Sequence, residues 1–245
     1  MTIIDCISDL HGHYPKLEGG DLLIVAGDLT ARNSEECYRK WYRWLEKCDY
    51  KKIIVIAGNH DNRIQDKGFP PMPASFNIEY LCDSGTEFVL GYPNLEPCFS
   101  EKEEKLYERK VLKIWGSPWT KKFEGMNPNC MAFTVDTEEE LASKFSLIPD
   151  DIDILVTHSP PYGVLDTVTK DIVNGIKCVR GFVHCGSHSL SSKLEKLPRP
   201  RLNVFGHIHE NGGKQKEYGT FTICVNASHV NEYYEPVNKP VRIII

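Results

Sequence analysis

Short polar motifs follow apolar runs along this chain, and most of them directly follow a run that is short enough to be a buried strand. The motifs are Asp9-Leu10-His11, Gly27-Asp28, Gly58-Asn59-His60-Asp61, Thr157-His158 and Gly206-His207-Ile208-His209. Side chains this far apart in sequence converge only if successive strands end at the same edge of a sheet. In open α/β sheets, ligands bind in the crevice outside the carboxyl ends of the strands. The pattern therefore predicts an α/β fold with a polar site at one sheet edge.

Length and composition are those of an ordinary globular protein. The 245 residues carry 41% hydrophobic and 26% charged side chains, with no internal repeat or break in composition, so we expect one domain over residues 1–245. The net charge of −5 offers no basic stripe for a nucleic-acid polymer, although a small nucleotide could still bind. The apolar runs are short, so we expect neither a membrane span nor a secretion signal.

The nine cysteines favour a reducing compartment. Their number is odd, no C-x-x-C pair occurs, and several lie in apolar runs, as Cys6 and Cys224 do. Buried free thiols fit this usage better than a disulfide framework. We therefore expect a cytoplasmic protein.

Apolar runs and helical spacing predict the main elements. Strands are expected at residues 2–8, 22–26, 53–57, 152–156, 202–205, 220–225 and 241–245, with a hairpin from residues 86–90 and 111–115. Apolar residues between Cys37 and Cys48 recur at helical spacing, with Ser34 as the expected N-cap. Further helices are expected at residues 137–145 and 187–197. The polar stretch between Tyr92 and Lys110 is left without a role.

The side chains of the motifs suit a pair of divalent metal ions. Carboxylate, imidazole and amide oxygen ligands fit manganese, iron or zinc. Asp28 is the natural bridge, since the two oxygens of one carboxylate offer separate lone pairs. Two cations about 3.5–4 Å apart can hold a phosphoryl group and activate water.

This set of motifs resembles the calcineurin-like metallophosphoesterases, whose pattern is D-x-H, G-D, G-N-H-[D/E], H and G-H-x-H. The resemblance implies a four-layer αββα sandwich of two mixed sheets flanked by helices. It implies one metal held by Asp9, His11, Asp28 and His209, and a second held by Asp28, Asn59, His158 and His207.

The resemblance also implies a mechanism. A metal-bridging hydroxide would attack phosphorus, without a covalent intermediate. His60 would protonate the leaving oxygen, and Asp61 would orient the His60 imidazole. Two divalent ions, with manganese favoured, are the implied cofactors.

Further segments resemble one branch, the metallophosphoesterase-domain-containing proteins of animal brain and their microbial relatives. These segments are Ile54 to His60, Gly116-Ser117-Pro118-Trp119, Thr157 to Pro161, Val204 to Glu210 and Asn226-Ala227-Ser228. The branch implies phosphodiesterase activity on small substrates, including cyclic nucleotides. Some members carry Gly at the position of His207 and are feeble catalysts, so the histidine here favours a competent enzyme. The chain departs from the branch between Tyr92 and Lys110.

Other polar residues are candidates for substrate contacts. Arg32 and Arg63 lie at offsets where Ser/Thr protein phosphatases place phosphate-binding arginines, although Ala31 and Asn33 break that pattern. Tyr162 could form a wall against a base or an aromatic leaving group. His184 and His188 have i, i+4 spacing, but Gly186 and Ser187 between them favour a loop-to-helix junction over a metal site.

Two alternatives to a phosphodiesterase stay open. A phosphomonoesterase or phosphoprotein phosphatase could use Arg32, because an arginine fork suits a dianionic monoester. A non-catalytic scaffold could keep the fold and bind partners through its surface, but the complete ligand set argues against it. Small phosphoesters or nucleotides are the expected binding partners, and oligomeric state and natural substrate are not indicated by the sequence.

Overall fold

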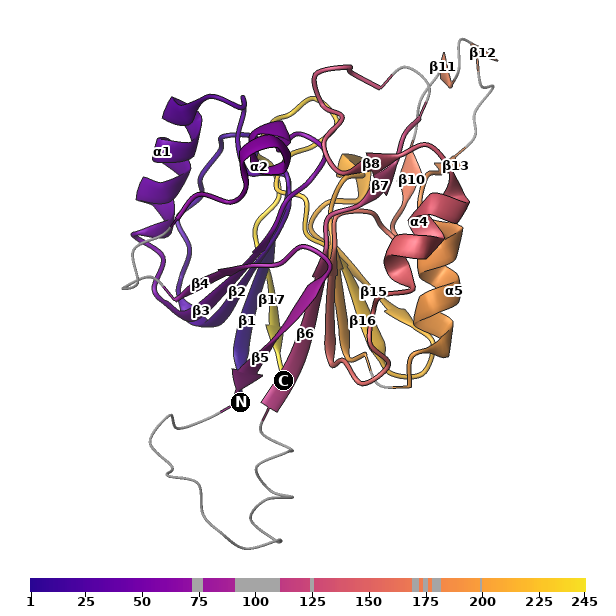
Figure 1. Ribbon diagram of the computed structural model, residues 1–245. Helices are drawn as coiled ribbons and strands as arrows, with labels where there is room; N and C mark the ends of the chain where they lie inside the picture. Colours follow the sequence, from indigo (N-terminus) through magenta and orange to yellow (C-terminus); the bar gives the residue numbers. More distant parts are fainter. Residues whose placement is uncertain are drawn as a thin grey trace, which may run out of the picture.

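Two sheets stand face to face with helices on their outer sides in the computed structural model of the chain (Figure 1). The structure describes residues 1–71, 77–90, 111–123, 126–168, 172–173, 176–177, 182–198 and 200–245. The polar stretch between Tyr92 and Lys110 lies outside these ranges. Three further pairs of two-residue strands accompany the sheets: β7 (Thr120–Lys121) with β8 (Thr134–Val135), β10 (Thr167–Val168) with β13 (Val183–His184), and β11 (Ile172–Val173) with β12 (Ile176–Lys177).

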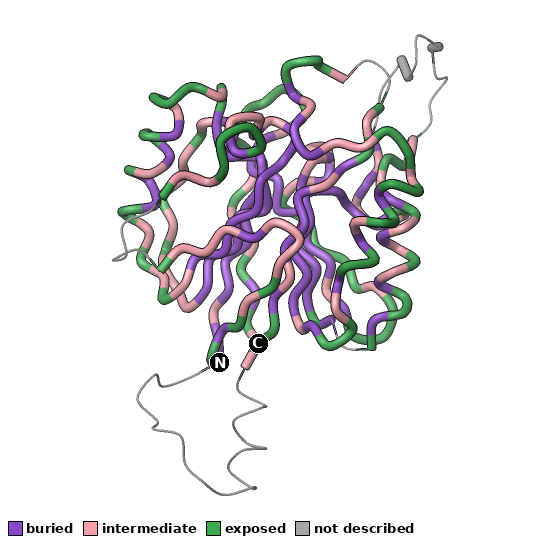
Figure 2. Tube along the Cα trace, viewed as in Figure 1, coloured by how far each residue is buried: buried purple, intermediate pink, exposed green. Residues whose placement is uncertain are grey.

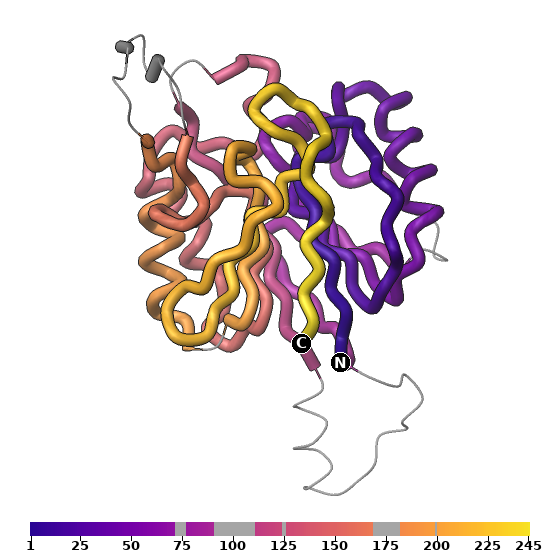
Figure 3. Tube along the Cα trace, turned by 180° about the vertical axis from the view of Figure 1, so that it is seen from behind, coloured from indigo at the N-terminus to yellow at the C-terminus, as the bar shows by residue number. Residues whose placement is uncertain are grey.

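The first sheet is mostly parallel. Its order is β17 (Val241–Ile244), β1 (Ile3–Ile7), β2 (Gly20–Ala26), β3 (Tyr50–Ile56) and β4 (Ile78–Tyr80). Strands β1 to β4 are parallel, whereas β17 runs antiparallel beside β1, as the view from behind shows (Figure 3). The carboxyl ends of β1, β2 and β3 therefore meet at one edge.

The second sheet has a parallel centre and antiparallel edges. Its order is β15 (Lys214–Tyr218), β16 (Thr222–Asn226), β14 (Leu202–Phe205), β9 (Ile154–Thr157), β6 (Val111–Ser117) and β5 (Ser84–Val89). The pairs β16–β14, β14–β9 and β9–β6 are parallel, and the outer strands β15 and β5 are antiparallel to their neighbours. Here too the carboxyl ends of β9 and β14 are adjacent.

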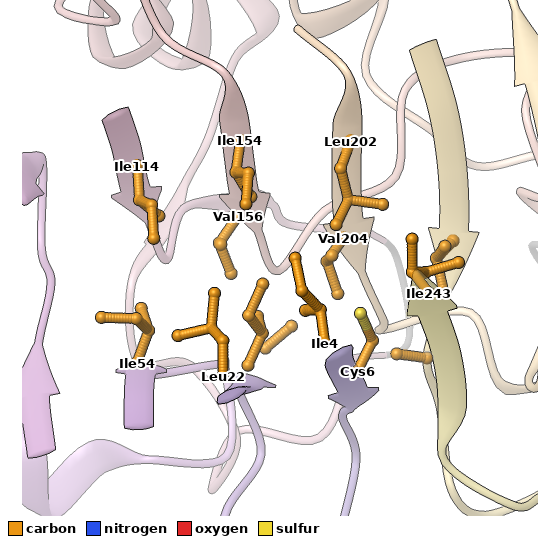
Figure 4. Close-up of a cluster of buried hydrophobic side chains, with 14 of the residues drawn as sticks. Ile4, Cys6, Leu22, Ile54, Ile114, Ile154, Val156, Leu202, Val204 and Ile243 are labelled. Carbon is orange, nitrogen blue, oxygen red and sulfur yellow. The ribbon is translucent and has the colours of Figure 1, made fainter. Parts of the chain in front are cut away.

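Apolar side chains from both sheets fill the space between them. Ile4 and Leu22 of the first sheet face Ile154 and Val204 of the second, and all four are fully buried (Figure 4). Burying one such side chain contributes about 1.5–3 kcal/mol. The near-continuous apolar runs of the central strands follow from this position, because these strands are covered on both faces.

Helices cover the outer face of each sheet. Helices α1 (Glu35–Leu45) and α2 (Asn62–Lys67) pack on the first sheet, and α4 (Glu138–Phe145) and α5 (His188–Lys196) pack on the second. The strands are buried, while the helices expose their outer sides (Figure 2). Their starts are defined by side chains: Ser34 accepts from Cys37 N at 3.2 Å, and Thr137 forms a capping box with Glu140.

The four-layer sandwich predicted from the resemblance is confirmed, as are the hairpin and the three predicted helices. The structure adds strands that the sequence did not indicate, notably β4 and the polar edge strand β15. Strand β3 also begins earlier than expected, at Tyr50, because Tyr50 pairs with Gly20 of β2. Within the described ranges, no helix combines the length and apolar composition that a membrane crossing requires.

Candidate metal centre

The predicted ligands gather where strands of both sheets end. Asp9 and His11 follow β1, Asp28 follows β2, and Asn59 follows β3. The remaining ligands come from the second sheet: His158 directly follows β9, and His207 and His209 follow β14, with His209 as the first residue of the 3-10 helix η1 (His209–Asn211). The structure thus brings together all seven residues that the motifs predicted as ligands.

The first predicted ligand set converges closely. His209 Nε2 lies 3.3 Å from Asp9 Oδ1 and 3.3 Å from His11 Nε2. His11 Nε2 also lies 3.6 Å from Asp28 Oδ2. Ligand atoms of Asp9, His11 and His209 all lie within 4.8 Å of one another, a spacing that one metal ion can span.

The second set converges around the Asn59 side chain. Asn59 Oδ1 lies 3.1 Å from His158 Nε2 and 3.0 Å from His207 Nδ1, while Asn59 Nδ2 donates to Cys130 O at 3.1 Å. That last bond turns the amide oxygen toward the histidines. His158 Nε2 is also 3.4 Å from Asp28 Oδ2, which links this set to the first.

One oxygen of Asp28 serves both sets. Asp28 Oδ1 accepts a hydrogen bond from the backbone N–H of His60 at 2.9 Å. Asp28 Oδ2 alone faces His11 and His158, at 3.6 and 3.4 Å. The sequence predicted Asp28 as the bridge between the two metals, and the structure places one of its oxygens between the two ligand sets.

The protonation of His158 tests whether a cation fits. His158 Nδ1 lies 2.8 Å from the carbonyl oxygen of Ala26, so in the neutral imidazole Nδ1 carries the proton and Nε2 presents a lone pair. That lone pair faces the oxygen atoms of Asp28 and Asn59. Electron pairs meeting in a buried site repel one another unless a positive charge lies between them.

His209 shows the same arrangement. Its Nδ1 lies 3.2 Å from the carbonyl oxygen of Asn231, so in the neutral imidazole Nδ1 carries the proton and Nε2 presents a lone pair to Asp9 Oδ1. Ligating histidines typically donate their other N–H to a carbonyl or carboxylate in this way. The donor set, the tautomers and the convergence of lone pairs therefore fit divalent metal ions in both positions.

The electrostatics also favour a cation. Burial lowers the pKa of His158, but the charge of Asp28 raises it to about 9, so a proton on Nε2 is the alternative to a metal ion at this point of the site. Burial lowers the pKa of His11 and of His207 to about 3, which keeps both imidazoles in the neutral form that binds metals. Despite burial, which raises it, the pKa of Asp28 is well below its usual range because of the neighbouring histidines.

The backbone at the ligands is strained. Asp9, His11, Asp28 and His207 all have positive φ, between 42° and 69°. Residues other than glycine seldom adopt this left-handed conformation, and it persists where the surroundings enforce it. The turns after the strands thus aim the ligand side chains into one space.

Two glycines leave room for the carboxylates. A Cβ atom at Gly206 would lie 2.0 Å from Asp9 Oδ2, and one at Gly58 would lie 2.3 Å from Asp28 Oδ1. These contacts explain why the motifs need Gly before His207 and before Asn59.

The model of the calcineurin-like phosphoesterase family matches residues 3–211. The chain belongs to this family.

The similarity to known proteins covers almost the whole chain. Metallophosphoesterase domain-containing protein 1 of Homo sapiens is 33% identical, over 97% of this chain and 69% of that protein. UPF0046 protein T07D4.2 of Caenorhabditis elegans is 29% identical, over 96% of this chain and 58% of that protein. A solved crystal structure with 15% identity covers 92% of this chain and 90% of its own, with a TM-score of 0.55, which supports the fold.

Asp61 has a different role from the one predicted. Its buried carboxylate accepts backbone N–H bonds from Gly58 and Asp28 at 2.8 and 2.9 Å, and from Leu29 at 3.1 Å. The Tyr38 hydroxyl donates to it at 3.3 Å. These contacts join the loops after β2 and β3, whereas the sequence predicted a contact with the His60 imidazole. Asp61 therefore positions the Asp28 and Asn59 loops rather than His60.

His60 lies beside the ligands rather than among the closest contacts. Its Nε2 is 3.9 Å from Asp28 Oδ2, its ring is 4.6 Å from that of His11, and its side chain keeps a 20% exposed fraction. His60 therefore lies at the boundary between the candidate centre and solvent.

Two residues near the centre were missed by the sequence reasoning. Ser228 Oγ donates to Asp9 Oδ2 at 2.7 Å, and Ser228 was noted only as part of Asn226-Ala227-Ser228. The ring of Tyr234 lies 4.8 Å from that of His11 and 5.2 Å from that of His209. No strand end or motif marks Tyr234, so the sequence carries no signal for it.

The predicted substrate contacts remain predictions. Arg32 is exposed, and among the contacts of the described residues none joins its side chain to the metal ligands. Tyr162 stacks on His188, with ring centroids 3.7 Å apart, and lies 5.1 Å from the ring of His184. The metal-binding groups found among the described residues include neither His184 nor His188, and Ser187 caps α5 between them as expected.

Proposed function

We propose that this protein hydrolyses small phosphodiesters, cyclic nucleotides among them, with two divalent metal ions as cofactors. The observation that carries the proposal is the convergence of imidazole nitrogens on Asp28 Oδ2 and on the neighbouring amide oxygen of Asn59. Family membership supports phosphoester hydrolysis, and the diester preference is our extension of it.

Each part of the centre has a distinct task in this proposal. Divalent ions bound by the two sets would polarise the phosphoryl oxygens and activate water. The chain holds its ligands ready through fixed tautomers at His158 and His209. His60, at the solvent boundary, delivers a proton to the leaving oxygen of the ester.

The cofactor and the compartment are also proposals. Manganese is the favoured ion, with iron and zinc as alternatives, since this mixed set of oxygen and nitrogen ligands accepts all three. Cys6 and Cys224 are free and buried in the structure, which supports a cytoplasmic, reducing environment.

Substrate preference provides the test. Manganese-loaded protein is assayed with bis-p-nitrophenyl phosphate and with p-nitrophenyl phosphate, followed by a panel of cyclic nucleotides. We expect kcat/KM to be higher for the diester. A strong preference for the monoester would favour the phosphomonoesterase alternative, and no hydrolysis of any ester would favour the scaffold.

A further inference from the structure

Tyr234 covers the first ligand set from outside the motifs. Its ring meets those of His11 and His209 edge-on, at 4.8 Å and 78° and at 5.2 Å and 89°. It also lies 6.3 Å from the ring of His60. One aromatic ring is therefore next to two candidate ligands and the candidate proton donor.

A tight loop holds Tyr234 in this place. Asn231 Oδ1 accepts from the backbone N–H groups of Tyr233 and Glu235, and the Tyr234 N–H donates to Asn231 O at 2.9 Å. The same carbonyl oxygen also accepts a hydrogen bond from His209 Nδ1 at 3.2 Å. The loop that positions Tyr234 is thus joined directly to a metal ligand.

The backbone of Tyr234 is itself strained. Its φ is 62°, in the left-handed region that tyrosine seldom adopts. Such conformations are energetically costly and cluster at active sites and ligand-binding sites.

The ring is open to solvent although it contacts the centre. Tyr234 keeps 48% of its surface exposed, so the ring forms part of the boundary of the site rather than part of the core. An exposed aromatic surface next to the ligands can contact the organic group of a phosphoester whose phosphate lies at the metals. Aromatic side chains provide a large apolar surface and favour edge or offset contacts with other rings.

We infer that Tyr234 is a substrate-binding residue that selects phosphoesters with an aromatic or other flat apolar ester group. The inference rests on the proposed function for the position of the phosphate. It assigns the specificity to the ring and not to the hydroxyl group.

Binding of two non-hydrolysable probes tests the inference without any need for activity. Phenylphosphonate and methylphosphonate are titrated by calorimetry into manganese-loaded protein, as wild type and as the Tyr234→Ala, Tyr234→Phe and Tyr233→Ala variants. Tyr233 is the matched control because it lies in the same loop and is 74% exposed. Bound metal and far-UV circular dichroism are measured for each variant, to show that the centre and the fold are intact.

We expect wild type to bind phenylphosphonate about two- to tenfold more tightly than methylphosphonate, the range that aromatic contacts support. Tyr234→Phe and Tyr233→Ala should keep this preference, and Tyr234→Ala should lose it. Equal binding of both probes by wild type, or a preference retained in Tyr234→Ala, overturns the inference. Loss of metal from Tyr234→Ala but not from Tyr234→Phe also overturns it, because the ring would then support the ligands and not the substrate. A preference that depends on Tyr234 in a protein that hydrolyses no ester would reject the proposed function but keep the inference.

Discussion

Among the described residues, two histidine-rich regions combine imidazoles with a buried carboxylate, and only the first has the geometry of a candidate metal centre. At the strand ends, Asp28 is 1% exposed and lies among His11, His60 and His158. In the second region, next to the loop that leads into α5, Asp166 is fully buried and accepts a hydrogen bond from His184 Nδ1 at 2.7 Å. Composition alone does not separate the two regions.

The difference lies in which atoms face the carboxylate. Asp166 Oδ2 accepts from the N–H groups of Gly163 and Gly186, and Oδ1 accepts from His184, so donors satisfy both oxygens. Asp28 Oδ2 instead faces His158 Nε2, which presents a lone pair in the neutral imidazole because Nδ1 donates to Ala26 O. A carboxylate surrounded by donors supports the structure, whereas one that faces lone pairs favours a cation.

Replacing Asp28 by asparagine should have the largest effect on activity and metal binding. Asp28→Asn removes the charge shared by both ligand sets, so we expect kcat/KM to fall by more than about 10⁴-fold, beyond what general acid help supplies. Metal content should fall with it. Steady-state kinetics and elemental analysis measure both effects.

Asp166→Asn is the matched control. It should leave metal content unchanged and lower the free energy of unfolding by about 1–3 kcal/mol, because an amide cannot accept from all three donors. If the two variants lost metal equally, the distinction between the regions would be wrong.

Removing one histidine from each region gives a smaller effect. His60→Asn should lower kcat by about 10²–10⁴-fold for esters with poor leaving groups, since proton delivery is lost while the ligands stay. The loss should shrink for p-nitrophenyl esters, whose leaving group needs little protonation. His184→Asn should leave both rates near those of wild type. If the His60 variant hydrolysed esters with poor leaving groups as fast as the His184 variant, the predicted role of His60 as proton donor would be wrong.

Among the variants at the candidate metal centre, Asp61→Asn should have a smaller effect than Asp28→Asn and His60→Asn. The amide places a donor against the N–H groups of Gly58, Asp28 and Leu29, so the loops that carry the ligands should loosen. Residues that orient ligands typically contribute 10–100-fold to metal affinity, and we expect a loss of about that size. Competition with a metal chelator measures it. An unchanged metal affinity, together with a kcat reduced as in the His60 variant, would instead favour the predicted role of Asp61 in orienting the His60 imidazole.

The parts of the fold that are predictable from sequence are those where burial dictates composition. Strand β9 reads Ile-Leu-Val-Thr and lies between two sheet neighbours, so its run of apolar residues reports its position directly. Edge strand β15 reads Lys-Gln-Lys-Glu-Tyr and is held by backbone pairing with β16, which leaves no apolar pattern to detect.

The centre shows the same limit. Ligands such as His158 are found because each directly follows a buried strand and belongs to a short motif. Tyr234 lies in a loop closed by Asn231, and Asp61 binds backbone N–H groups, so their roles depend on how distant loops meet. Contacts of this kind follow from tertiary structure and leave no local pattern.

Both sheets contribute ligands to the candidate centre, so metal binding is expected to stabilise the contact between the two sheets. Asp9 and Asn59 follow strands of one sheet, whereas His158 and His207 follow strands of the other. Ions that bind only the folded chain stabilise it by mass action, by about 2.7 kcal/mol at a concentration one hundred times Kd. The heat resistance of this protein is therefore expected to vary with the metal concentration around it, so a cell poor in the right ion would lose folded molecules as well as activity.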